Sequence, residues 1–235
     1  MKTDTPTVFI TGASGNLGRA VAQHFLDQDA RLALVARSAQ ALQQHFGAWP
    51  AERVLLIPAD LLDPQAAKQA AQQALARFGR IDVLCNLAGG FDMGAPVHAT
   101  PLANWQKQYE LNVLTTLHAI QAVVPHMVAQ GAGKVVNIGA YAARQGAANM
   151  GAYIAAKAAV IRMTESMAAE LRGQGVNVNC VLPTIIDTPE NRLAMPDADP
   201  ASWVAPDKLA QTIGFLASDA ASAIHGAALP VTGLS

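Results

Sequence analysis

Short apolar runs alternate with longer, alanine-rich stretches along the whole chain. Several of these runs are continuous, which is typical of strands that are covered on both faces. Strands that alternate with helices in this way form a parallel sheet with helices on both sides, so the pattern predicts an α/β fold with a doubly wound sheet of about seven strands. We expect strands at 8–10, 31–36, 54–57, 81–85, 134–138, 176–182 and 228–231, and helices at 17–27, 39–46, 64–78, 102–129 (with a bend near Pro125), 153–172 and 206–217.

No internal repeat or linker interrupts this pattern, so residues 1–235 are expected to form a single domain. The one long irregular segment is 183–206, which contains Pro189, Pro196 and Pro200. A loop of this length inside a compact domain usually has a function. We expect it to be a lid over a small-molecule substrate, and the alternative is a surface loop without a role.

The composition changes the picture of the surface. Charged residues make up 14% of the chain, against about 25% in average domains, and hydrophobic residues make up 51%. Either the sheet has a large two-sided core, or part of the helical surface is buried between subunits. We favour the second reading, a homodimer or homotetramer.

Charge and polar residues exclude several classes of partner. The formal net charge is -1 and no run of Lys and Arg is present, so we expect no nucleic-acid partner. The helix at 102–129 carries Asn112, His118 and other polar residues, so we expect no membrane span. Residues 1–7 are too short and polar for a signal peptide, which favours a cytoplasmic protein. The six histidines lack metal-site spacing, so no metal is expected.

A glycine-rich turn, Thr11-Gly12-Ala13-Ser14-Gly15-Asn16-Leu17-Gly18, joins the first strand to the first helix. At this point a doubly wound fold binds the pyrophosphate of a dinucleotide, because glycine lets the backbone come close and the helix N-terminus offers free N–H groups. The position of the turn, more than its composition, indicates a Rossmann-type cofactor site.

The end of the second strand bears on the choice of cofactor. No acidic residue is present at Ala36-Arg37-Ser38 to accept a hydrogen bond from a ribose 2′-hydroxyl, whereas Arg37 could pair with a 2′-phosphate. We therefore predict NADP(H) as the preferred cofactor, with NAD(H) possible. After the third strand, Asp60 and Leu61 could meet the adenine, and after the fourth strand Asn86, Ala88 and Gly89 leave room for the cofactor.

Tyr153 and Lys157 lie four residues apart on an expected helix, which puts both side chains on one face. A phenol is a poor acid or base at neutral pH, but a neighbouring ammonium stabilises the phenolate. Such a pair can exchange a proton with a substrate while hydride moves to or from a nicotinamide. The same spacing also occurs by chance, so its weight depends on the other motifs.

Taken in order, these motifs resemble the short-chain dehydrogenase/reductase family over essentially the whole chain. The resemblance rests on the glycine turn, Asn86-Leu87-Ala88-Gly89, Asn112, Tyr153 with Lys157, and the segment 183–188. It implies that Tyr153 is the catalytic acid and base, that Lys157 binds the nicotinamide ribose, and that Asn112 holds a water in a proton relay. Pro183, Ile186 and Thr188 would lie at the nicotinamide end.

Two departures from the family are visible. Asn16 stands where most members have glycine, and Ala140, thirteen residues before Tyr153, stands where the family has its catalytic serine. Both departures are shared with one branch, the dihydropteridine reductases, to which the segment 182–203 is also similar. Arg37 departs from that branch, which typically prefers NADH, and so does Phe91, which stands where an indole is expected.

Three hypotheses follow from the missing serine. The first is an NADPH-dependent reductase of a flat, electron-poor substrate such as a quinonoid dihydropterin, which needs little activation. The second is a reductase of ordinary ketones or aldehydes that uses another orienting group. The third is a catalytically weak NADP-binding regulatory protein. Candidate substrate contacts are Phe91, Ala140, Tyr141, Met150 and Trp203.

Overall fold

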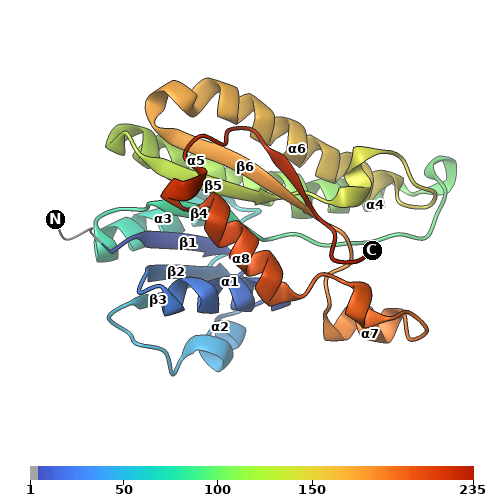
Figure 1. Ribbon diagram of the computed structural model, residues 1–235, viewed down its shortest axis with the longest axis horizontal. Coiled ribbons are helices and arrows are strands. Elements are labelled where there is room, and N and C mark those ends of the chain that lie inside the picture. The colour runs from blue at the N-terminus through green and yellow to red at the C-terminus, as the bar shows by residue number, and fades with distance from the viewer. Residues whose placement is uncertain (1–4) are drawn as a thin grey trace.

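The computed structural model describes residues 5–235, so residues 1–4 of the N-terminal segment considered above lie outside the described residues. Seven parallel strands form one sheet in the order β3-β2-β1-β4-β5-β6-β7 (Figure 1). This confirms the predicted doubly wound α/β fold. The strands are β1 (Thr7–Thr11), β2 (Arg31–Ala36), β3 (Val54–Pro58), β4 (Val83–Asn86), β5 (Gly133–Ile138), β6 (Val176–Pro183) and β7 (Ala228–Val231).

Helices cover both faces of the sheet. One layer holds α1, α2 and α8, and the other holds α3, α5 and α6 (Figure 1). In β1, Val8 and Ile10 pack into the first layer and Phe9 into the second, which is why this strand reads as a continuous apolar run. The helices are α1 (Asn16–Asp27), α2 (Ala39–Phe46), α3 (Pro64–Phe78), α4 (Leu102–Tyr109), α5 (Thr115–Gln130), α6 (Gly151–Leu171), α7 (Pro189–Ala194) and α8 (Pro206–Leu216).

The helix expected at 102–129 is interrupted at a different place from the one predicted. Pro125 lies inside α5, and the change of hydrogen bonding falls at a π-helical turn, Glu110–Leu114, between α4 and α5. Asn112 lies in this turn, and its Nδ2 donates to the carbonyl of Gln108 at 3.0 Å. The side chain thus takes an acceptor that the helical backbone would otherwise use, which favours the wider turn.

The helical run Leu102–Gln130 is long and apolar enough, by length and composition alone, to cross a membrane. Within the fold, however, 56% of its most apolar window is buried. Its buried side chains include Val123 and Met127, which pack with α3 and α6 against the sheet. The run therefore serves the fold as a core helix.

The expected irregular segment at 183–206 contains more structure than its prolines predicted. It holds α7 and a 3-10 turn at Pro200–Ser202, and Ile186 pairs with Val204 in an isolated parallel bridge. α7 lies at the periphery of the domain, at the same end as the C-terminus (Figure 1).

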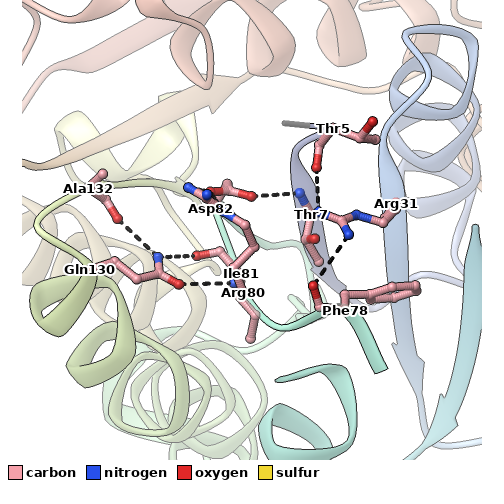
Figure 2. Close-up of polar contacts among 9 residues, drawn as sticks. All are labelled: Thr5, Thr7, Arg31, Phe78, Arg80, Ile81, Asp82, Gln130 and Ala132. Carbon is pink, nitrogen blue, oxygen red and sulfur yellow. Dashed lines mark hydrogen bonds and ion pairs between the residues drawn. The ribbon is translucent and has the colours of Figure 1, made fainter. Parts of the chain in front are cut away.

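A polar network closes the amino-terminal edge of the central strands (Figure 2). The Asp82 carboxylate accepts from the backbone N–H of Thr7 at 2.8 Å and pairs with Arg80. Gln130 donates to the carbonyl of Ile81 at 3.0 Å, and Arg31 donates to that of Thr5 at 2.7 Å. These bonds anchor the starts of β1, β2 and β4, so their carboxyl ends are held in register at the opposite edge.

Candidate active site

A cleft of about 270 Å³ opens at the carboxyl edge of the sheet, where the strand order reverses direction between β1 and β4. In doubly wound folds this switch point is the usual place for a ligand. The lining comprises the glycine turn, the ends of β2 to β4 and the π-helical region, namely Gly12, Ser14, Gly15, Ala36, Arg37, Ala59, Asp60, Leu61, Leu62, Leu87, Ala88, Gly89, Leu111 and Thr115.

The glycine turn forms the floor of this cleft. Gly12 has a φ of 64°, and a Cβ on it would come within 2.8 Å of the backbone nitrogen of Ala88. A Cβ on Gly18 would overlap the carbonyl oxygens of Gly12 and Ala13. The helix α1 begins directly after Gly15, which has no side chain to cap it. The turn therefore combines close backbone packing with the free N–H groups of a helix N-terminus, as pyrophosphate binding requires.

Thr11 is a supporting residue that we considered only as part of the turn. Its hydroxyl oxygen accepts from the backbone nitrogens of Leu87 and Ala88 at 3.0 and 3.1 Å. It thereby fixes the loop after β4 against the glycine turn, and both segments line the cleft. A hydroxyl residue directly before the turn was the only signal for this role in the sequence.

Arg37 and Asp60 lie where the adenosine end was expected. Both line the cleft and both are exposed. Within residues 5–235 no hydrogen bond or ion pair engages the Arg37 guanidinium, so its five donors are free for a ligand. Asp60 accepts from the backbone nitrogen of Leu62 at 3.0 Å, and Leu61 is buried beside it.

The predicted catalytic pair lies in the first two turns of α6. Lys157 is 6% exposed, and its ammonium donates to the carbonyl of Ile138, at the end of β5, at 2.9 Å. Burial lowers the pKa of Lys157 to about 8, and it raises the pKa of the half-buried Tyr153 to about 12. At neutral pH the site thus holds a protonated phenol and a buried ammonium on one helix.

Asn112 and Lys157 meet at the wall of the cleft. A Cβ on Gly89 would lie 2.8 Å from Asn112 Oδ1 and 3.3 Å from Lys157 Nζ. Asn112 Oδ1 accepts from the backbone nitrogen of Gly90 at 3.1 Å, and Nδ2 donates to the Gly90 carbonyl at 3.0 Å. The third predicted catalytic residue therefore lies next to the lysine and fixes the loop after β4. The buried side chain of Gln108, which is 1% exposed, also accepts a hydrogen bond from Asn112 and so holds the Asn112 amide in place. The sequence analysis did not identify this residue.

The five predicted substrate contacts lie in different surroundings. Phe91 packs edge-on against Tyr153 with 4.9 Å between ring centroids, and it is 57% exposed. Ala140 is buried at the end of β5, and the neighbouring Tyr141 lies under the Arg144 guanidinium. Met150 is half-buried before α6, and Trp203 is buried near the C-terminus. The ring contact with Tyr153 places Phe91 beside the catalytic pair.

The residues expected at the nicotinamide end lie at the start of segment 183–206. Pro183 ends β6, Ile186 forms the bridge to Val204, and Thr188 caps α7 by accepting from the backbone nitrogen of Asn191 at 3.2 Å. Asn16, which begins α1, donates to Glu190 of α7 at 2.7 Å. The segment is therefore attached to the cofactor turn, although it does not line the cleft.

These features together define a nicotinamide-binding oxidoreductase domain: a glycine cradle that a Cβ would fill, free helix N–H groups and a Tyr-Lys pair at the same edge. The sequence matches the short chain dehydrogenase family over residues 6–198. The chain belongs to this family. Within residues 5–235 no group of His, Cys, Asp or Glu side chains could hold a metal ion.

The relatives are dehydrogenases of small molecules. The 2-(R)-hydroxypropyl-CoM dehydrogenase of Xanthobacter autotrophicus is 35% identical over 95% of this chain and 96% of its own length. The D-threitol dehydrogenase of Mycolicibacterium smegmatis is 33% identical over 98% and 92%.

Solved structures agree on the fold and differ in their cofactor. NAD+-bound xylitol dehydrogenase superposes with a TM-score of 0.90 at 25% identity, covering 99% of this chain and 100% of its own. ElxO with NADP bound also has a TM-score of 0.90 at 25% identity, covering 97% and 98%. The neighbours thus include both nicotinamide cofactors, and none of these four proteins is a dihydropteridine reductase.

Proposed function

We propose that this protein is an NADPH-dependent reductase of a small, flat and electron-poor substrate, similar in chemistry to the dihydropteridine reductases. The observation that carries the proposal is the combination of an assembled Tyr153, Lys157 and Asn112 with a buried alanine at 140. Tyr153 and Lys157 can transfer a proton to the substrate. Position 140, however, carries no hydroxyl that could orient and polarise a carbonyl group. A substrate that already accepts hydride readily does not need that hydroxyl.

The mechanism follows from the protonation states. The Tyr153 phenol, with its raised pKa, is protonated at neutral pH. It can donate this proton to the nitrogen or oxygen of the substrate that is being reduced. As the proton leaves, the Lys157 ammonium stabilises the phenolate. The bound nicotinamide supplies the hydride. Asn112 holds the loop after β4 in place beside the lysine, and the exposed face of Phe91 offers a flat surface next to the phenol.

The proposed preference for NADPH rests on Arg37. Its guanidinium lines the cleft without a protein partner, and a 2′-phosphate would satisfy it with charge-assisted hydrogen bonds. Replacing it by alanine should raise the KM for NADPH at least about ten-fold and leave the KM for NADH nearly unchanged, since such bonds contribute about 1.5–3 kcal/mol. An unchanged ratio of the two constants would refute this role.

A second candidate function is the reduction of an ordinary ketone or aldehyde, or the reverse oxidation of an alcohol. It is favoured by the two relatives named above, which are alcohol dehydrogenases by name and cover almost the whole chain. In this case another group must orient the substrate oxygen, and Tyr141 is the nearest hydroxyl in sequence to Ala140.

The deciding experiment measures NADPH and NADH oxidation with quinonoid dihydropterin, beside a panel of simple ketones, aldehydes and quinones. Turnover of the dihydropterin supports the first candidate, and turnover of carbonyls alone supports the second. Tyr153→Phe should lower kcat by about 10²–10⁴-fold in either case, because it removes the proton donor. Full activity of this variant would refute catalysis by Tyr153. Tight NADPH binding without turnover of any tested compound would favour the NADP-binding regulatory protein instead.

A further inference from the structure

The side chain of Asn16 connects two segments that are far apart in the sequence. Its Nδ2 donates to Oε2 of Glu190 at 2.7 Å, and its Oδ1 accepts from Arg19. One contact uses the amide nitrogen of Asn16 and the other uses its amide oxygen, so the two contacts together fix the orientation of the side-chain amide. A glycine at position 16 could make neither contact.

Glu190 belongs to a locally rigid unit. It is the second residue of α7, whose first turn is capped by Thr188. Asn191 donates to the Ile186 carbonyl at 2.8 Å, and Arg192 makes two bonds to Asp187 at 2.6 and 2.7 Å. Holding Glu190 therefore holds the whole start of segment 183–206.

The contact is that of an ionised carboxylate. The pKa of Glu190 lies below its ordinary value, first because its own backbone N–H bonds to the carboxylate and further because of Asn16 and the charge of Arg19. Hydrogen bonds to an ionised acceptor are stronger than neutral ones. At neutral pH the Glu190 carboxylate that accepts from Asn16 is therefore ionised, although the bond lies at the surface.

We propose that Asn16 and Glu190 form a clasp that fastens α7 to the glycine turn and slows the release of the bound dinucleotide. Asn16 directly follows Gly15, which lines the cleft, and Thr188, two residues before Glu190, belongs to the stretch expected at the nicotinamide end. Arg37, the glycine turn and Gly89 line the cleft, and Lys157 lies beside Gly89, so these residues would hold a bound dinucleotide. Since Asn16 adjoins the lining residue Gly15, the clasp lies beside the cleft and ties α7 to the turn that would hold the pyrophosphate. Opening of the clasp would then precede movement of that turn and release of the cofactor.

The test measures the rate of NADPH release from the full-length protein by stopped-flow displacement, without any substrate. This readout is independent of the substrate proposed above. Asn16→Gly and Glu190→Ala should each accelerate release by about three- to ten-fold, which is the effect of one net hydrogen bond. The double variant should release NADPH no faster than either single variant, because all three break the same bond.

Two further variants separate the clasp from a general effect on charge or folding. Glu190→Gln keeps an acceptor for Asn16 but removes its charge, so it should accelerate release by less than Glu190→Ala does. Glu170→Ala removes an exposed carboxylate from the end of α6, away from the cleft, and should leave release unchanged. The proposal is overturned if Glu190→Ala does not accelerate release, if Glu190→Gln accelerates it equally, or if the two single effects multiply in the double variant.

Discussion

Lys157 is a buried cation, and the structure predicts what its charge does to stability. The ordinary pKa of a lysine is 10.5, and burial lowers that of Lys157 to about 8. Each pKa unit corresponds to about 1.4 kcal/mol. Keeping the ammonium in place at pH 7 therefore costs the folded state about 3 kcal/mol relative to a lysine in water, a large fraction of a typical stability.

The sign of the pH dependence follows from linkage. Between pH 8 and 10.5 the unfolded chain binds a proton at this lysine that the folded chain has lost. Stability must therefore rise with pH across this window, and the cost is fully present below pH 8 and absent above 10.5. Lys157→Met keeps an unbranched stem of similar volume and removes the charge, but it leaves the Ile138 carbonyl without its donor, which costs about 1 kcal/mol.

The assay is equilibrium unfolding in urea of the cofactor-free wild type and Lys157→Met at pH 7 and at pH 10.5. At pH 7 the variant should be more stable by about 2 kcal/mol, and at pH 10.5 it should be less stable by about 1 kcal/mol. The variant should also lose the activity of the wild type. Lys68→Met, at an exposed position of α3, controls for the loss of a lysine as such. A stability difference that is the same at both pH values would refute a lowered pKa at Lys157.

Two substitutions test the architecture of the site, and one measurement on the wild type tests its assembly. Gly12→Ala should destabilise the protein by more than about 1–3 kcal/mol, the cost of a positive φ alone, because its Cβ would also overlap the Ala88 backbone; thermal unfolding measures this. Asn112→Leu should lower the free energy of unfolding by about 3 kcal/mol and speed hydrogen exchange of the Gly90 amide, whose buried acceptor it removes. An oligomer predicted from the low charge content should appear in light scattering as a multiple of 24.5 kDa, and a monomer at micromolar concentration would contradict it.

The strands and most helices could be predicted because their signals are local. In β1 every residue is buried, and the continuous apolar run Val8-Phe9-Ile10 identified it. The glycine turn was recognisable because the tight connection between the first strand and the first helix requires glycine, and the glycines are visible in the sequence. Tyr153 and Lys157 were found by their spacing on one helix, which α6 provides.

The π-helical turn at Glu110–Leu114 could not be predicted, because the Asn112 side chain bonds both to the Gln108 carbonyl one turn earlier and to Gly90 in the loop after β4, and the second contact exists only in the folded protein. The same reason hid the Asn16–Glu190 bond, whose partners are 174 positions apart. Lys157 was expected next to a cofactor, but its burial and its bond to Ile138 depend on the packing of α6 against β5 and β6. Sequence patterns indicate the periodicity of an element and the positions that need a particular backbone conformation. Contacts between side chains that are distant in the sequence become visible only in the folded structure.

The catalytic helix is held in place by polar contacts that do not involve position 140. Asn86, at the end of β4, donates to Asn137 of β5 at 2.8 Å, and Asn137 donates to Thr164 of α6 at 2.9 Å. These residues are at most 1% exposed, so the chain of bonds fixes α6 relative to the strand that precedes the cofactor loop. Together with the Lys157–Ile138 bond, this chain of bonds holds the predicted proton-transfer residues in place without a hydroxyl at position 140. We therefore favour the proposal of a substrate that needs little activation over that of a protein that has lost catalysis.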